Sequence, residues 1–149
     1  MDPASPPLVF RTLTWIGIIE QLQRTRAERI LKPLGLGFPE FSMLVHFSHG
    51  HPPEKTVTGI ASDMQQLQPA VTKTVAKLVA KGFVKAAPNA ADGRSKVLTM
   101  TSKGKAGLAR ALAAMEPPTM AAFAGWSAAE LEQLFSGLDR LKRHLDADR

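Results

Sequence analysis

The sequence predicts a mainly α-helical protein with one small β-hairpin, of class α+β. Apolar residues recur at helical spacing through most of the 149 residues. Two short runs of strand-forming residues, starting at Phe83 and at Val97, flank a segment rich in turn-forming residues, 88–96. Because 44% of the residues are hydrophobic, a chain of this length has enough apolar surface to form a core.

Composition and motifs exclude several classes of protein. The absence of cysteine rules out a disulfide framework, a thiolate zinc site and a cysteine nucleophile. The longest strongly apolar stretch, Trp15 to Ile19, is far shorter than the ~18 residues of a membrane span. The N-terminus resembles no secretory signal, so a cytoplasmic protein is expected. No nucleophile elbow, phosphate-binding loop or paired-carboxylate motif occurs, so we expect no enzyme activity, no catalytic residues and no cofactor.

The first predicted helix, residues 8–31, follows a proline-rich segment, 1–7, that we expect to be disordered. Between residues 8 and 22 its apolar side chains cover more than half of the circumference, which is wider than one core face requires. This width predicts a second buried side, against a partner or a ligand. Pro33, Gly35 and Gly37 then separate the helix from the next one, about 39–48.

A short helix, about 57–66, and a tight turn lead into a helix over 69–82. Its apolar face is predicted to contain Val71, Val75, Leu78 and Val79. Lys73, Lys77 and Lys81 recur every four residues on the opposite face, where like charges repel by a few tenths of a kcal/mol. Such a stripe is easier to understand if phosphates lie opposite it.

Two helices are predicted after the hairpin. Thr101 caps the first, 102–115, which Pro117 and Pro118 are expected to end. A capping box of Ser127 and Glu130 opens the second, 128–146. Five leucines of this last helix follow a heptad seam, which predicts a helix that packs into a dimer interface: Leu131, Leu134, Leu138, Leu141 and Leu145.

The positive charge is concentrated in the middle of the chain. Of the formal net charge of +6, most falls within residues 67–104, which carry seven cations and one anion, Asp92. A local excess of this kind is typical of a surface that binds a polyanion such as nucleic acid. Lys81 and Lys85 are expected to be solvated.

A short helix, a tight turn, a second helix with a basic outer face and a β-hairpin together describe a winged helix-turn-helix. The segment 92–104 (DGRSKVLTMTSKG) resembles the wing pattern of the MarR family of bacterial transcription regulators, and 71–84 resembles that family's recognition helix and its exit. Residues 31–44 are similar to the junction of the family's first two helices. Gln68 stands where the family commonly has a serine or threonine N-cap.

The resemblance implies which segments of the chain would form a dimer and which would bind DNA. Residues 8–37 would be a dimerisation helix and linker, 38–101 the winged helix-turn-helix DNA-binding domain, and 102–149 the C-terminal dimerisation helices. The major groove would be contacted by Gln68, Pro69, Ala70, Thr72, Lys73 and Lys77. Arg94 would enter the minor groove, Ser95 and Lys96 would contact the DNA backbone, and Asp92 would orient Arg94 and brace the wing.

The expected function is that of a homodimeric transcription regulator of pseudo-palindromic double-stranded DNA. The family also implies a pocket for a small-molecule effector, for which Trp15, Ile19 and Phe41 are candidates. Three alternatives remain open. The chain could be a nucleoid-type or RNA-binding protein without sequence specificity, or a helical interaction partner that binds no nucleic acid. It could also be a metal-sensing member of the family that uses His46, His49 and His51, although no metal site is expected.

Overall fold

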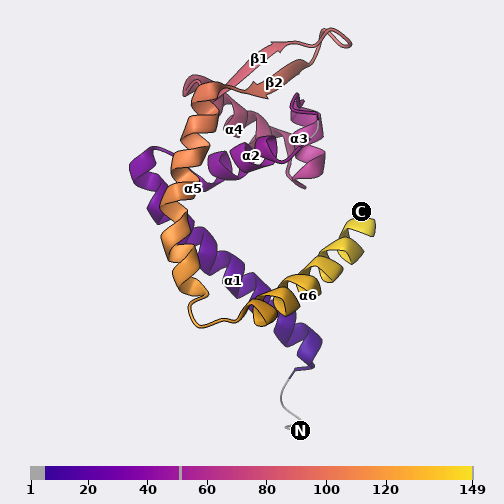
Figure 1. Ribbon diagram of the computed structural model, residues 1–149. Coiled ribbons are helices and arrows are strands. Elements are labelled where there is room, and N and C mark those ends of the chain that lie inside the picture. The colour runs from indigo at the N-terminus through magenta and orange to yellow at the C-terminus, as the bar shows by residue number, and fades with distance from the viewer. Residues whose placement is uncertain (1–5, 51, 149) are drawn as a thin grey trace. The chain divides into compact units, whose positions relative to one another are not determined.

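The computed structural model describes residues 6–50 and 52–148, and it confirms a mainly helical fold with one antiparallel hairpin (Figure 1). The chain forms two compact units, one up to Met115 and one from Glu116 onward. The first contains α1 (Leu8–Leu31), η1 (Lys32–Leu34), α2 (Phe38–Ser48), α3 (Val57–Asp63), α4 (Gln68–Ala80), β1 (Val84–Pro88) and β2 (Lys96–Met100). Helix α5 (Ser102–Ala122) begins in this unit, and α6 (Ala128–Ala147) belongs to the second.

The core of the first unit lies among the helices of the helix-turn-helix and the base of the hairpin. Helix α4 packs against α2, α3 and β1. The largest side chains that are almost fully buried come from six elements: Leu31, Met43, Leu44, Ile60, Val71, Leu78, Val84 and Leu98. Burial of this set fixes the position of α4 relative to the rest of the unit.

The hairpin is joined to the helical core at its base. β1 and β2 pair in the register Val84↔Met100 to Pro88↔Lys96. The backbone of Lys55, just before α3, exchanges two hydrogen bonds with Leu98, of 2.9 and 2.7 Å. These bonds place the backbone of Lys55 beside the middle of β2 and tie the hairpin to the segment just before α3.

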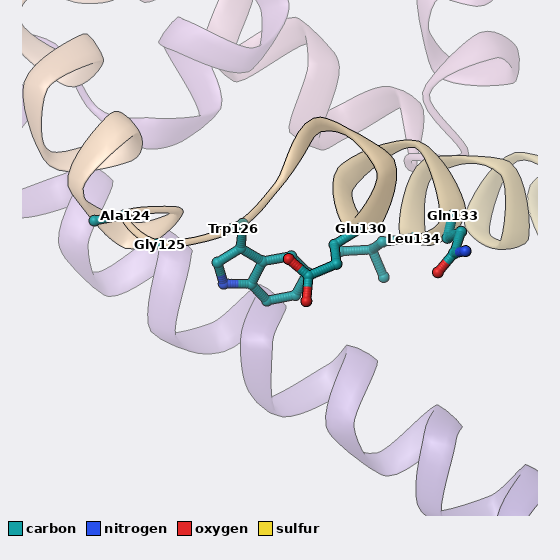
Figure 2. Close-up of a pocket in the computed structure, with 6 residues that line it drawn as sticks. All are labelled: Ala124, Gly125, Trp126, Glu130, Gln133 and Leu134. Carbon is teal, nitrogen blue, oxygen red and sulfur yellow. The ribbon is translucent and has the colours of Figure 1, made fainter.

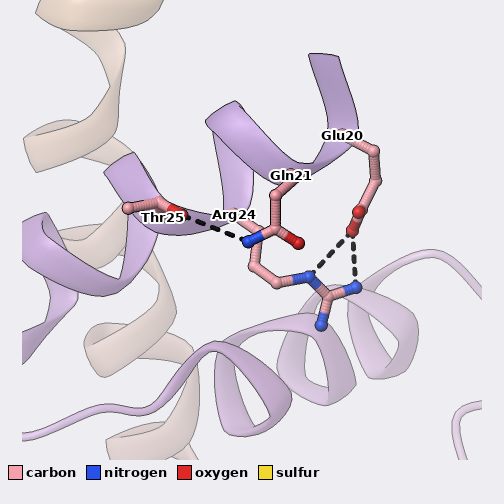
Figure 3. A network of polar contacts seen from close by, with 4 residues as sticks. All are labelled: Glu20, Gln21, Arg24 and Thr25. Atoms are coloured by element: carbon pink, nitrogen blue, oxygen red, sulfur yellow. Dashed lines mark hydrogen bonds and ion pairs between the residues drawn. The ribbon is translucent and has the colours of Figure 1, made fainter. Parts of the chain in front are cut away.

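Helix α1 is confirmed over residues 8–31, and most of its apolar surface is exposed. Only Ala27 and Leu31 are buried, whereas Leu8, Phe10 and Leu22 are more than 60% exposed. Polar contacts stabilise its later half: Arg24 pairs with Glu20, and Gln21 donates to Thr25 (Figure 3). The Arg24 guanidinium also lies 4.9 Å from the ring centre of Phe38, at the start of α2.

The expectation that Pro117 and Pro118 end the helix over 102–115 is wrong, because α5 continues through both to Ala122. A proline removes the donor for the carbonyl four residues earlier. For Pro117 that carbonyl belongs to Ala113, which is exposed, so water can satisfy it. The boundary between the two units falls directly before these prolines.

Helix α6 opens with the predicted capping box. The Glu130 N–H donates to the Ser127 hydroxyl at 3.2 Å, and the Ser127 N–H donates to the Glu130 carboxylate at 2.7 Å. These bonds lower the pKa of Glu130. No residue of α6 is buried, and four of its five seam leucines are exposed. Within the described ranges, no helix has the length and apolarity needed to cross a bilayer.

Candidate nucleic-acid interface

Helix α4 separates a buried face from a basic exposed one. It begins one residue earlier than predicted, with Gln68 and Pro69 in its first turn, and ends at Ala80. The buried face consists of Val71, Thr74, Val75 and Leu78, and the Thr74 hydroxyl donates to the carbonyl of Ala70 at 3.1 Å. All six predicted major-groove residues are exposed: Gln68, Pro69, Ala70, Thr72, Lys73 and Lys77.

The assignment of Val79 to the apolar face was wrong, because this side chain is 41% exposed. Thr74, whose hydroxyl is satisfied within the helix, occupies the buried face in its place. Residue spacing alone could not distinguish the two, since both lie near the edge of the face.

The hairpin loop has its own hydrogen-bond network. The Asp92 carboxylate accepts the backbone N–H of Arg94 at 3.0 Å, and the Asp92 carbonyl accepts the N–H of Ser95 at 3.1 Å. The Asn89 amide donates to the Ser95 hydroxyl at 2.9 Å. Asp92 therefore braces the backbone of the loop and leaves the Arg94 guanidinium exposed. The sequence predicts a turn-rich segment that includes Asn89, but it does not predict the bond between the Asn89 amide and Ser95.

A groove of about 660 Å³ lies between α4 and the hairpin. Its lining brings together Gln68 and Thr72 of α4 with Arg94, Ser95 and Lys96 of the wing, which are separated by more than twenty residues in sequence. Thr56 and Thr58, at the start of α3, also line it and were not predicted. Thr56 is the N-cap of α3, with its hydroxyl accepting from Gly59 at 3.1 Å.

The cations of this surface have no acidic partner among the described residues. None of the ion pairs in the described part of the chain includes Lys73, Lys77, Arg94 or Lys96. Cations that are exposed, clustered and unpaired create a positive potential that attracts phosphates.

Lys81 is not solvated as expected. Its ammonium group donates to the Glu40 carboxylate and to the Gly35 carbonyl. The Glu40 side chain is only 7% exposed, and its other oxygen accepts the Gly37 N–H at 3.3 Å. The end of α4 is thereby tied to the joint between α1 and α2, and the lysine stripe offers two cations to a ligand instead of three.

The histidines do not come together as a metal site in the part of the chain that the structure describes. His51 lies outside that part. His49 Nδ1 is 2.8 Å from the Val45 carbonyl, and His46 Nε2 is 3.5 Å from an oxygen of Asp63. Across the described ranges, no group of three or more histidine, aspartate or glutamate side chains is arranged to hold a metal.

Burial, with Lys55 nearby, lowers the pKa of His46 in spite of the opposing effect of Asp63. The unfolded chain therefore binds a proton first as the pH falls below about 6.5, and stability is lost as the pH falls. We expect the urea midpoint to drop more between pH 7.5 and 5.5 in the wild type than in His46→Gln. His144→Gln is the control and should keep the wild-type decline, since it leaves His46 in place. An equal decline in His46→Gln would contradict this assignment.

The candidate effector residues lie in different environments. Phe41 is part of the core, whereas Trp15 is 60% and Ile19 53% exposed on α1. Trp126 is 46% exposed and borders a surface hollow with Glu130, Leu134 and neighbouring residues (Figure 2). The Glu130 carboxylate at this hollow is already engaged in the capping box.

Comparisons with known proteins agree with this geometry. Residues 34–95, which run from the end of η1 to the wing, match the model of the MarR family. The transcriptional regulator BldR from Sulfolobus solfataricus is 23% identical, with a TM-score of 0.79 over 91% of this chain and 94% of that chain. Wild-type MarR from E. coli, in its apo form, is 20% identical, with a TM-score of 0.76 over 92% and 97%.

A third similar structure is Staphylococcus aureus MarR in complex with salicylate and kanamycin. It is 17% identical, with a TM-score of 0.83 over 95% of each chain. At these identities the structural matches show a shared fold, and the family match covers the segment that contains α4 and the start of the wing.

Proposed function

Because this chain belongs to the MarR family, by the match of its residues 34–95 and by its winged-helix fold, we propose that it is a homodimeric transcription regulator of pseudo-palindromic duplex DNA. One observation carries the proposal: Arg94 and Lys96 of the wing line the same groove as Gln68 and Thr72 of α4. The lysines of α4, Lys73 and Lys77, are exposed and have no acidic partner among the described residues. Helix α4 enters the major groove, and Arg94 enters the adjacent minor groove. The sugar-phosphate strand between the two DNA grooves runs along the groove of the protein.

The division of the chain in this proposal follows the sequence prediction. Residues 38–101 bind DNA, and the helices within 8–37 and 102–149 form the dimer. Support comes from the apolar side chains of α1 and α6 that are exposed in one chain: Leu8, Val9, Phe10, Leu13, Trp15, Leu22, Leu134, Phe135, Leu138 and Leu145. Burial of such apolar surface favours association, and only the part that exceeds the entropy lost on association appears as affinity.

A small molecule that shifts the spacing of the two α4 helices would regulate binding. The solved structure of a similar protein with salicylate and kanamycin supports a search for such a ligand. Trp15 and Ile19 would contribute to its site only if a second copy covers them, since both are exposed in one chain.

The test is selection of bound sequences from a random duplex pool, followed by competition with unrelated DNA. We expect two half-sites about one helical turn apart and a specific-to-nonspecific affinity ratio above ~10³. A ratio near one would favour a nucleoid-type or RNA-binding protein. No binding to any duplex at low salt would overturn the proposal and favour a protein-interaction role.

Removing a cation that binds phosphate should also change the salt dependence of binding. We expect Lys73→Ala and Arg94→Ala each to weaken binding and to flatten the log–log salt slope by about 0.9 for every phosphate that the variant no longer neutralises. Lys142→Ala is the control, because Lys142 pairs with Asp146 on α6, and it should leave the slope unchanged. An unchanged affinity and slope for Arg94→Ala would show that Arg94 of the wing does not contribute to the DNA interface.

A further inference from the structure

Leu67, at the start of the recognition helix, has an unusual environment for a large hydrophobic residue. It is 78% exposed, the highest value of any large hydrophobic side chain among the described residues. It also occupies the N-cap of α4, where no side chain makes a capping bond. Leucine is a poor N-cap residue compared with serine, threonine, aspartate or asparagine. At this position leucine supports neither the helix nor the core.

The position of Leu67 is nevertheless well defined by its backbone. Its carbonyl accepts the N–H groups of Ala70 and Val71 at 3.0 and 3.1 Å. The turn before it is closed by a bond of 2.9 Å from the Gln66 N–H to the Ala61 carbonyl. Leu67 is therefore held at the tip of α4 by the hydrogen bonds of two helices, next to the exposed Pro69 and Ala70.

We propose that Leu67 reads thymine through the C5-methyl group in the major groove, an inference that rests on the proposed function. Residues at the start of a recognition helix reach base edges. The thymine methyl is the apolar group that those edges display in the major groove, and apolar side chains discriminate it. With Pro69 and Ala70, Leu67 makes an apolar tip on a helix whose exposed charged side chains are Lys73 and Lys77.

Charge favours DNA over a second protein copy as the occupant of this tip. If two copies met through it, the unpaired Lys73 and Lys77 of one would face those of the other, and α4 itself has no acidic side chain to offset them. Phosphates on both sides of the major groove offer these lysines counter-charges while the apolar tip meets the bases. The tip therefore contributes specificity, and the lysines contribute affinity that is independent of sequence.

The test replaces single thymines of the selected half-site with deoxyuridine, which removes only the methyl group. For the wild type we expect one or two positions per half-site at which affinity falls about fourfold, the value for burial of one methyl group. In Leu67→Ala this loss should shrink to less than twofold at the same positions, with an unchanged salt slope. Leu34→Ala, which truncates an exposed leucine of η1 that does not line the groove, is the matched control and should keep the wild-type pattern.

The possible outcomes distinguish the proposed role of Leu67 from the proposed function of the whole protein. Specific binding that is insensitive to every methyl removal, or an equal loss in wild type and Leu67→Ala, would overturn the role of Leu67 alone. A Leu67→Ala protein that dissociates into protomers more readily and keeps the deoxyuridine pattern would assign the residue to a contact between copies, and would also overturn it. Failure of the wild type to bind any duplex would overturn the proposed function itself.

Discussion

Gly104→Ala is expected to destabilise the protein by about 3 kcal/mol or more, the upper part of the range for overpacking. A Cβ at this position would lie 2.2 Å from the Phe83 carbonyl oxygen and 2.8 Å from Met100 Cγ. Because the closer atom belongs to the backbone, no side-chain rotation relieves the clash. The same carbonyl accepts the Thr101 N–H at 2.9 Å, so a shift of α5 would also disturb the base of the hairpin.

Urea denaturation followed by circular dichroism measures this effect. Gly137→Ala is the control, since a Cβ there meets no atom within 4 Å and the residue lies inside α6. Removing a helical glycine at such a site should stabilise by about 0.5–1 kcal/mol. Equal unfolding midpoints for Gly104→Ala and the wild type would show that α5 does not pack against Phe83 as closely as described.

Lys81→Met is expected to destabilise the protein by about 2 kcal/mol. The substitution leaves the buried Glu40 carboxylate without its cation, which costs about 3–5 kcal/mol for a fully buried pair. The loss is smaller here because the Lys81 side chain is 35% exposed. Lys85→Met, on the exposed edge of β1, is the control and should change stability by less than about 0.5 kcal/mol.

A double variant tests the cause of this loss. In Glu40→Gln with Lys81→Met no unpaired charge remains, and the amide oxygen can still accept the Gly37 N–H, so we expect part of the lost stability to return. The salt slope of DNA binding should be unchanged in Lys81→Met, because the lysine contacts protein and no phosphate. A stable Lys81→Met protein with a slope flatter by about 0.9 would identify Lys81 as a phosphate contact instead.

The contrast between Lys81 and its neighbours shows how far a local pattern can be interpreted. Lys73, Lys77 and Lys81 have identical spacing, and the sequence predicts one exposed face for all of them. Two remain exposed, but the third meets Glu40, which lies 41 residues earlier in the chain. Periodicity reports which side of a helix a residue occupies, and it carries no information about which distant segment packs against that side.

The prolines and glycines show the same limit of local sequence patterns in predicting the course of the backbone. The sequence correctly predicts a break at Gly35, which adopts positive φ, and the capping box of α6. It extends the helix over 69–82 to Gly82, which has positive φ and lies beyond the end of α4. The prediction that the helix over 102–115 ends at Pro117 is wrong. Ala113, whose carbonyl loses its donor, is exposed to water, and the helix continues. The sequence also gives no reason for Gly104, whose missing side chain is required by a carbonyl twenty-one residues earlier.

By itself, the sequence determined the order of the helices and strands, the basic character of α4 and the wing, and most of the residues on the exposed face of α4. These features depend on local periodicity, turn chemistry and charge, which neighbouring residues specify. Only the tertiary structure decided that α4 and the wing share one groove, that Lys81 is used internally and that Leu67 is left exposed at the helix tip. Each of these depends on contacts between residues far apart in the chain, and such contacts form only when the core is packed.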